Sequence, residues 1–446
     1  MNAMTSDHYV TEFARVKATL PGQRLPWLKN IREEALTNFR ARGFPTLHDE
    51  DWKYTSVAQI EKGHFELLHS AAMITDNIDA AQINALALSD AQLLVFVDGH
   101  YASALSRIDA LPIGITVASL SEVLAHEPEQ IPACVHAQLS HPSQGYASGF
   151  TALNAACMAD GAYVHLAVGA MLDTTIQLLF ITSSANLATH CRNLVFAERD
   201  SRVCIVEHHA TLGAANYFTN VVTDIVVERG AEIEHHKLQQ EGPQAFHVAT
   251  VNAILGEKSR FISSSFALGS VLARTDIQVV LNAEGAECAL DGLYIANSRQ
   301  HIDHHTRIDH VRPGGTSREF YKGVMAGASH AVFNGKVIVH PNAQKSDASQ
   351  TNRNLLLSKQ AEVDTKPQLE IWADDVKCSH GATVGPLDDN QIFYLRSRGV
   401  GAATARTLLT YAFVTEMVDR VRSAPLRNRL DQLLHERLPQ LVETLP

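Results

Sequence analysis

The sequence contains few cysteines, and none of them forms a Cys-x-x-Cys pair. The six cysteines are spread over 446 residues, at positions 134, 157, 191, 204, 288 and 378. Such sparse and uneven use is typical of free thiols in a reducing compartment and argues against a disulfide framework. The first ten residues include Asp7 and His8 and hold no apolar segment, so we expect no signal peptide and a cytoplasmic location.

Three further absences narrow the function. No apolar run approaches the ~20 residues that a bilayer-spanning helix needs, so no membrane association is expected. The 37 Lys and Arg residues against 48 Asp and Glu residues give a net charge of −11, which argues against a nucleic-acid binder. The segment Gly256-Glu257-Lys258-Ser259 lacks the pattern of a phosphate loop, and no Gly-x-Gly-x-x-Gly opens a helix. We therefore expect that this chain binds no nucleotide.

The N-terminal part carries helical patterns. Apolar residues recur at helical spacing over residues 13–20 and 25–40, and Gly43 is expected to end the second helix. Asp51 is a candidate cap for a short turn, and Trp52 is a candidate anchor in the core.

The middle of the chain reads as β-structure. Short β-branched segments begin at Leu93, and almost no helical periodicity remains between about residues 160 and 370. Small residues that open a turn and a strand recur at positions 162, 201, 231, 259, 286 and 316, mostly about 30 residues apart. Stacked coils of equal circumference produce such spacing, so the pattern predicts a parallel β-solenoid. A β-sandwich with coincidental turn spacing is the alternative.

The end of the chain is helical again. Asp388 or Asp389 is expected to cap a helix that Gly399 ends, a longer helix follows from Ala402, and Pro425 begins the last one. The last helix carries an apolar stripe of Leu430, Leu433, Leu434 and Leu438. Such a stripe is more typical of intramolecular core than of a partner surface.

These patterns divide the chain into three predicted domains. Residues 1–90 form an N-terminal helical domain, residues 91–385 form the β-solenoid, and residues 386–446 form a C-terminal helical domain.

Histidine is abundant, and its densest run is His301–His310. On a strand, His301, Asp303 and His305 would share a face, and two imidazoles with a carboxylate suit zinc or iron(II). Neighbouring same-face positions lie ~7 Å apart, too far for all three to hold one ion without other ligands. The run therefore has two readings: ladder contacts between coils, or the site of a stand-alone metal-dependent enzyme. Weaker candidates are His208-His209 and His235-His236.

A second candidate site lies near the end of the predicted solenoid. Cys378 and His380 are two residues apart and would share one face of a strand. Thiolate and imidazole are ligands that iron and iron–sulfur clusters accept. A cluster usually takes about four protein ligands, so this pair would need ligands from another chain. A Cys–His nucleophile pair and a structural role are the competing interpretations.

At these residues the chain resembles the SufB/SufD family of iron–sulfur cluster assembly proteins. The resemblance is strongest at residues 361–371, 373–385 and 392–399, and it extends to 333–335, 351–356, 43–46 and 51–55. It is strong from about residue 300 to 415 and local near residue 50.

The resemblance implies a right-handed parallel β-helix flanked by helices. It also implies a non-catalytic scaffold in a complex with SufB, which pairs with the β-helix edge, and with the ATPase SufC, which docks on the C-terminal helices. His380 would be a metal ligand at a site for a transient iron–sulfur cluster shared with SufB, and Cys378 lies beside it.

Two features favour the SufD branch of this family. No cysteine lies between Cys288 and Cys378, where SufB carries the one that accepts sulfur, and the chain has Cys-Ser-His where SufB has a Glu-containing segment. The run His301–His310 falls where the family keeps a polar His/Asp pattern, which favours ladder contacts. Whether the isolated chain forms a homodimer stays open.

Overall fold

The computed structural model describes residues 3–68, 78–140, 148–213 and 215–443, with side chains described from Asp7 to Val442. The helices are α1 (Ala3–Val16), α2 (Pro26–Arg42), α3 (Ala58–Lys62), α4 (Ala80–Leu86), α5 (Leu120–Leu124), α6 (Ala133–Ser140), α7 (Gly149–Cys157), α8 (Asp389–Ser397), α9 (Ala402–Asp419) and α10 (Ala424–Glu443), with short 3-10 turns η1 (Glu50–Trp52), η3 (Ser103–Leu105) and η4 (Pro128–Gln130).

The strands are β1 (Glu66–Leu67), β2 (Gln92–Val97), β3 (His100–Tyr101), β4 (Ile115–Ser119), β5 (Ala162–Leu166), β6 (Ile176–Thr182), β7 (Leu187–Ala197), β8 (Arg202–Thr211), β9 (Phe218–Val227), β10 (Glu232–Gln240), β11 (Phe246–Leu255), β12 (Arg260–Ala267), β13 (Leu272–Leu281), β14 (Glu287–Ala296), β15 (His301–His310), β16 (Thr316–Met325), β17 (His330–Val339), β18 (Asp347–Leu356), β19 (Glu362–Ile371) and β20 (Lys377–Gly385).

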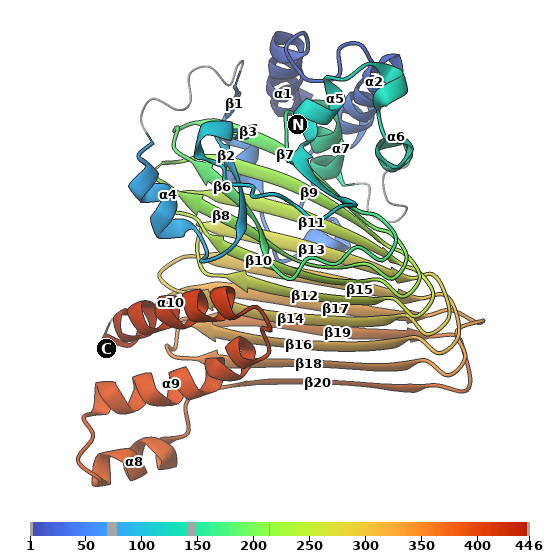
Figure 1. Cartoon of the computed structure of the whole chain (residues 1–446). Helices are drawn as coiled ribbons and strands as arrows, with labels where there is room; N and C mark the ends of the chain where they lie inside the picture. Colours follow the sequence, from blue (N-terminus) through green and yellow to red (C-terminus); the bar gives the residue numbers. More distant parts are fainter. Residues whose placement is uncertain (1–2, 69–77, 141–147, 214, 444–446) are drawn as a thin grey trace.

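The strands wind into a solenoid with two sheets (Figure 1). From β5 onwards, odd-numbered strands join one sheet, which ends at β19, and even-numbered strands join the other, which ends at β20. Strands that neighbour each other after one coil are parallel and in register; Leu272 of β13, for example, lies opposite His301 of β15. Parallel pairing excludes the β-sandwich alternative, whose sheets are antiparallel, and confirms the predicted solenoid.

The repeat seen in the sequence marks the same corner of successive coils. Residues 201, 231, 259 and 286 directly precede β8, β10, β12 and β14, and residue 316 opens β16. Residue 162 instead opens β5, which belongs to the other sheet, and this explains why the first spacing is longer than the rest.

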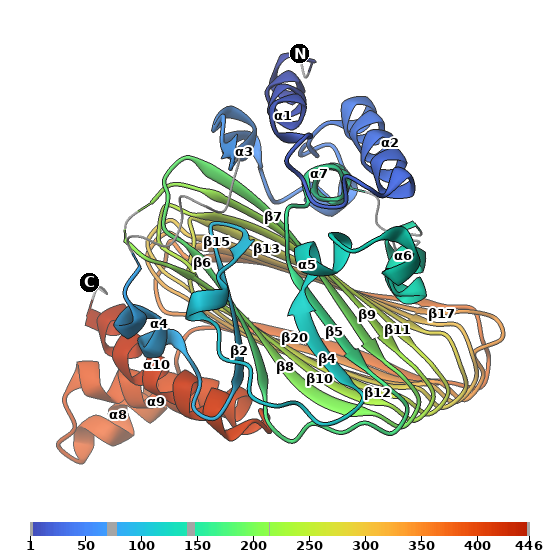
Figure 2. The same ribbon diagram turned by 45° about the horizontal axis from the view of Figure 1, so that its top comes forward.

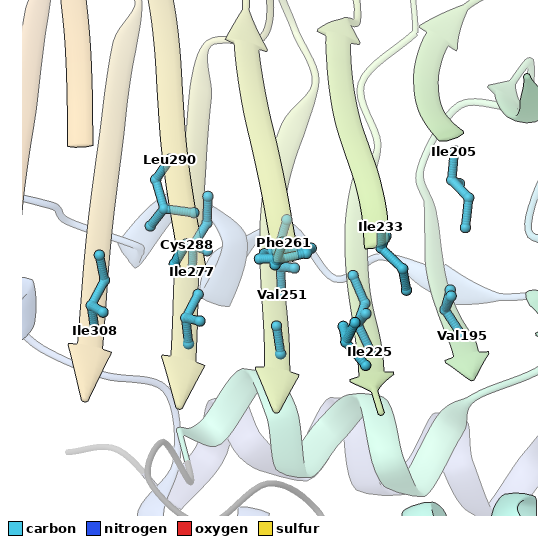
Figure 3. Close-up of a cluster of buried hydrophobic side chains, with 14 of the residues drawn as sticks. Val195, Ile205, Ile225, Ile233, Val251, Phe261, Ile277, Cys288, Leu290 and Ile308 are labelled. Atoms are coloured by element: carbon cyan, nitrogen blue, oxygen red, sulfur yellow. The ribbon is translucent and has the colours of Figure 1, made fainter. Parts of the chain in front are cut away.

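Alternate residues of each strand fill the interior of the solenoid. Figure 3 shows part of this core, in which Val195, Ile225 and Val251 of the odd-numbered sheet lie near Ile205 and Ile233 of the even-numbered sheet. The same rows continue through Phe261, Ile277, Leu290 and Ile308.

Helices α1, α2 and α7 pack on the outside of the odd-numbered sheet, whereas α4 packs against β2 and β6 of the other sheet. Phe39, Trp52 and Phe150 share a buried cluster with Phe218 of β9 and Phe246 of β11. Phe150 belongs to α7. Three short helices, α5 to α7, lie within residues 91–385, the range that the sequence assigns to the β-solenoid. The domain boundaries at 90 and 385 stay a prediction.

Helices α9 and α10 cover the outside of the even-numbered sheet (Figure 2), whereas α8 has no buried residue. Asp388 caps α8, since its carboxylate accepts a hydrogen bond from the backbone N–H of Asn390 at 2.8 Å. The stripe of Leu430, Leu433, Leu434 and Leu438 is buried with residues of β8 to β18, which confirms that it is intramolecular core.

Several local expectations are met, and one is wrong. Gly43 ends α2 with a φ of 66°, Trp52 is buried, and all six cysteines are free. The expected cap at Asp51 is wrong, because the short turn begins after Asp49, whose own carboxylate accepts a hydrogen bond from the backbone N–H of Thr46 at 2.7 Å. Among the described residues, no helix is long and apolar enough to cross a bilayer.

Candidate functional site at the open end of the solenoid

The last strand of each sheet has one unpaired edge. Within the described part of the chain, β19 pairs only with β17 and β20 pairs only with β18. Inner strands are almost wholly buried, whereas most side chains of β20 are exposed. An exposed strand edge carries free N–H and C=O groups that can pair with another chain.

Cys378 and His380 lie on β20, at this open end. Their partners on β18 are Ala348 and Gln350, which are buried in the interior, so both side chains lie on the interior-facing side. Cys378 is half-buried against the apolar core, and this burial raises the pKa of its thiol. His380 is exposed. The structure thus places both residues on one strand face, as the sequence predicts.

A buried polar column leads to His380 from within the solenoid. Glu319 of β16 lies opposite Gln350, which lies opposite His380. The Gln350 amide donates to Glu319 Oε2 at 2.6 Å, and the Thr306 hydroxyl donates to the other carboxylate oxygen. Burial raises the pKa of Glu319 to about 7. Sequence reasoning missed this column, because a Glu and a Gln in alternating strands look like solvent-facing positions.

The pair lacks the ligands that would close a metal site. Among the described residues, the groups of three or more metal-ligating side chains that lie close together include neither Cys378 nor His380. One thiol and one imidazole on an open edge can take part in a site only if other ligands come from outside this chain.

The histidine run forms β15, and its residues alternate between the two faces. His304 and His310 point into the interior, where they contact Ser265 Oγ at 3.0 Å and Ser317 Oγ at 2.9 Å. His301 faces outwards and contacts its register partner His330, with ring centroids 4.8 Å apart. The His301–His330 contact is a ladder contact between coils, as the sequence analysis favoured, whereas His304 and His310 contact serines of the opposite sheet across the interior.

The Asp303 carboxylate of this run is already used. Asp303 Oδ2 accepts hydrogen bonds from Arg274 Nη1 at 2.7 Å and from Thr55 Oγ1 at 2.5 Å, while His305 lies 3.1 Å from its other oxygen. Burial alone would raise the pKa of Asp303, but Arg274 and the nearby histidines hold it well below its usual range. Thr55 also contacts His301 at 2.8 Å.

Residues 50–55, which we call the N-terminal strap, fasten the helical region to the solenoid at this point. The Arg274 guanidinium stacks on Trp52, 3.7 Å from the ring centroid, and donates to the Asp51 carbonyl at 2.7 Å. Glu50 pairs with Lys366 of β19. The histidine run is therefore a docking surface for the strap, and the structure does not support the stand-alone metal enzyme.

Two other clusters of metal-ligating side chains are present among the described residues. One consists of Cys204, Glu234 and His236, and the other of His209, Glu241 and His247. They contain His209 and His236, from the two pairs that the sequence analysis ranked lowest. The pairing of neighbouring strands brings the members of each cluster together, and the sequence alone does not show which residues are paired.

Comparison with known proteins matches two family models to this chain. The family model described as "SUF system FeS cluster assembly, SufBD core domain" matches residues 180–413, and the model of the SufBD protein N-terminal region matches residues 3–178. The chain belongs to the SufB/SufD family.

Several known proteins are similar to this chain over most of its length. It is 35% identical to the iron–sulfur cluster assembly protein SufD of Escherichia coli, with 91% of this chain and 92% of that protein covered. It is 33% identical to an iron–sulfur cluster assembly SufBD family protein of Synechocystis sp., with 93% and 92% covered. It is 26% identical to the chloroplastic protein ABCI7 of Arabidopsis thaliana, with 96% and 90% covered.

Proposed function

We propose that this chain is a non-catalytic scaffold subunit for iron–sulfur cluster assembly. In this proposal, His380 and Cys378 bind a nascent cluster, which is cargo, together with ligands of a sister subunit of the SufB type. The observation that carries the proposal is the position of an incomplete ligand pair on an unpaired strand edge. The proposal is also supported by the family of the chain, whose model is described by iron–sulfur cluster assembly.

The open end supports pairing with SufB. The edges of β19 and β20 can extend both sheets across an interface, because main-chain hydrogen bonds join strands of different chains as they join strands of one chain. Exposed apolar side chains accompany these edges: Ile371 is 41%, Trp372 67% and Val384 47% exposed. Their burial would add hydrophobic stabilisation to the interface.

The C-terminal helices support a second contact, with an ATPase of the SufC type. Phe393 and Tyr394 of α8 are 73% and 58% exposed, and Leu408 of α9 is 49% exposed. Adjacent exposed aromatic residues are typical of protein interfaces. Since this chain has no phosphate loop, ATP would be bound by the partner. The six free thiols support a cytoplasmic complex.

The test is substitution at the proposed ligand. The variant His380→Ala, co-expressed with SufB and SufC, should assemble the complex, because His380 is exposed and supports no described core contact. The iron and acid-labile sulfide held per complex should fall several-fold. The matched control is Ser379→Ala, which changes the neighbouring exposed residue on the other face of β20.

Wild-type cluster content in the His380→Ala complex would contradict the ligand role. A stable cluster on the isolated chain, without any companion subunit, would contradict the shared site.

A further inference from the structure

Cys204, Glu234 and His236 form a cluster on the outside of the even-numbered sheet, far along the chain from the open end. Cys204 of β8 and Glu234 of β10 are register partners, and His236 follows two residues later on the same face of β10. Ile205, which follows Cys204, and His235, which lies between Glu234 and His236, point into the solenoid. The three side chains therefore share the outer face because of strand alternation.

His236 has no hydrogen-bonding partner in the described part of the chain. Its side chain is 1% exposed, and neither ring nitrogen makes a hydrogen bond to a described residue. The Nε2 atom lies 3.6 Å from Glu234 Oε2, which is too long for a hydrogen bond. A buried imidazole without a partner costs free energy, so it calls for an ion or a water that is not part of the chain.

The spacing of the cluster suits a metal ion. One ligand atom from each of the three residues lies within 4.8 Å of the other two. Two ligands that are each ~2.1 Å from a tetrahedral zinc ion stand ~3.4 Å apart, close to the 3.6 Å between His236 and Glu234. In the second cluster, His247 and Glu241 lie only 2.7 Å apart, and Glu241 already accepts from Thr219 and Gln239. The Glu241 carboxylate is therefore already used by neighbouring side chains, and His209 Nε2 contacts Glu207 at 2.7 Å.

One carboxylate oxygen of Glu234 is available to bind a metal ion. Arg422, in the connection between α9 and α10, donates to Glu234 Oε1 at 3.0 Å and to Glu232 at 2.8 Å. Glu234 Oε2 faces His236. The guanidinium thus orients the carboxylate, and Glu232 shares its positive charge.

The thiol of the cluster is reachable from solvent. Cys204 is partly exposed, as is Glu234, whose side chain is 14% exposed. Burial, and next the Glu234 carboxylate, raise the pKa of Cys204 to about 12, so the free thiol carries a proton at neutral pH. On metal binding this proton leaves to solvent as the sulfur–metal bond forms, as for other thiolate ligands.

We propose that Cys204, Glu234 and His236 bind one divalent transition-metal ion of the zinc and iron(II) class. A thiolate, an imidazole and a carboxylate are ligands that such ions accept, and three protein ligands leave a fourth position for water. The site is separate from Cys378 and His380 and does not depend on the proposed cluster function.

The test uses the purified full-length chain, stripped with a chelator and then titrated with Co²⁺. Binding at Cys204 gives a thiolate-to-cobalt charge-transfer band in the near ultraviolet, and one equivalent of Zn²⁺ should remove it. The band should be lost in Cys204→Ser. The affinity for Zn²⁺ should fall at least ~10-fold in His236→Ala, since losing a group that merely orients a ligand already costs that much.

Two cysteine variants serve as controls. Cys378→Ser and Cys134→Ser each remove another partly exposed thiol, and both should keep the band. A band that survives in Cys204→Ser, or that disappears in Cys378→Ser, would overturn the proposal.

A measurement on the wild-type chain covers the case in which the variants do not fold. Zn²⁺ should slow the alkylation of Cys204, followed by mass spectrometry, and leave that of Cys134 unchanged. Equal alkylation rates of Cys204 with and without Zn²⁺ would also overturn the assignment.

Discussion

At the scale of single residues, Arg274 joins the N-terminal strap to the solenoid. Its side chain is fully buried, stacks on Trp52 and pairs with Asp276 and Asp303. A buried ion pair adds little net stability by itself, but removing one partner leaves an uncompensated charge.

We therefore expect Arg274→Met to destabilise the chain by about 3–5 kcal/mol. Thermal unfolding should show this as a lower midpoint. The control is Arg318→Ala, which breaks a pair with Asp347 whose side chains are each 43% exposed. That loss should stay below about 1 kcal/mol, because water screens the pair. Equal midpoints for the two variants would contradict the structural role given to Arg274.

Glu319 makes the stability of the chain depend on pH. In the folded chain burial raises its pKa to about 7, against an ordinary value of 4.5. A raised pKa means that the contribution of the carboxyl to stability is fully present below about pH 4.5 and is lost as the pH rises through about 7.

The isostere Glu319→Gln has no proton to lose, so it should gain stability relative to wild type as the pH rises. The difference should grow from near zero at about pH 4.5 to an order of ~3 kcal/mol at about pH 8. Denaturant titrations of both proteins at the two pH values test this. A difference that does not change with pH would show that Glu319 is not desolvated as described.

At the scale of the element, β20 is the strand whose unpaired edge we propose as the contact with a partner. Val384 lies on the interior-facing side of this strand and is 47% exposed. A lysine there would place a charge beside any strand that pairs with the edge, a device that natural sheets use to prevent such pairing.

We expect Val384→Lys to fold normally but to reduce co-purification with a SufB-type partner. The control is Val168→Lys, at a valine that is 54% exposed in the loop after β5, at the other end of the solenoid. Undiminished co-purification of the Val384→Lys protein would show that the partner does not use this edge.

The elements differ in how well the sequence predicts them. The solenoid was predictable because its coil length recurs and because apolar residues alternate along β-branched segments. The strand face shared by Cys378 and His380 was predictable from their spacing of two. The contact of Thr55 with Asp303 was not, because 248 residues separate them and only the folded topology brings them together.

The polar half of the interior also escapes sequence reasoning. Glu207 and Lys237 are each 1% exposed and pair at 2.9 Å, yet in the sequence they look like ordinary surface residues. Alternation shows that successive side chains take opposite faces, but it does not show which face is inside when both carry polar groups.

At the scale of the whole molecule, the two ends of the solenoid are unequal. The first coils end in β3 and β4, which are two and five residues long and pair antiparallel with their neighbours. The last coil ends in strands of ten and nine residues with free edges.

A solenoid with long unpaired edges at one end only can join a partner at that end but cannot continue into a longer assembly. Two such molecules, or one of them and the proposed sister subunit, could meet end to end, and the described residues of this chain would then offer no second long edge to a third molecule. This geometry favours discrete pairs over filaments, and in the proposed complex a second copy and a sister subunit would compete for the same strand edges.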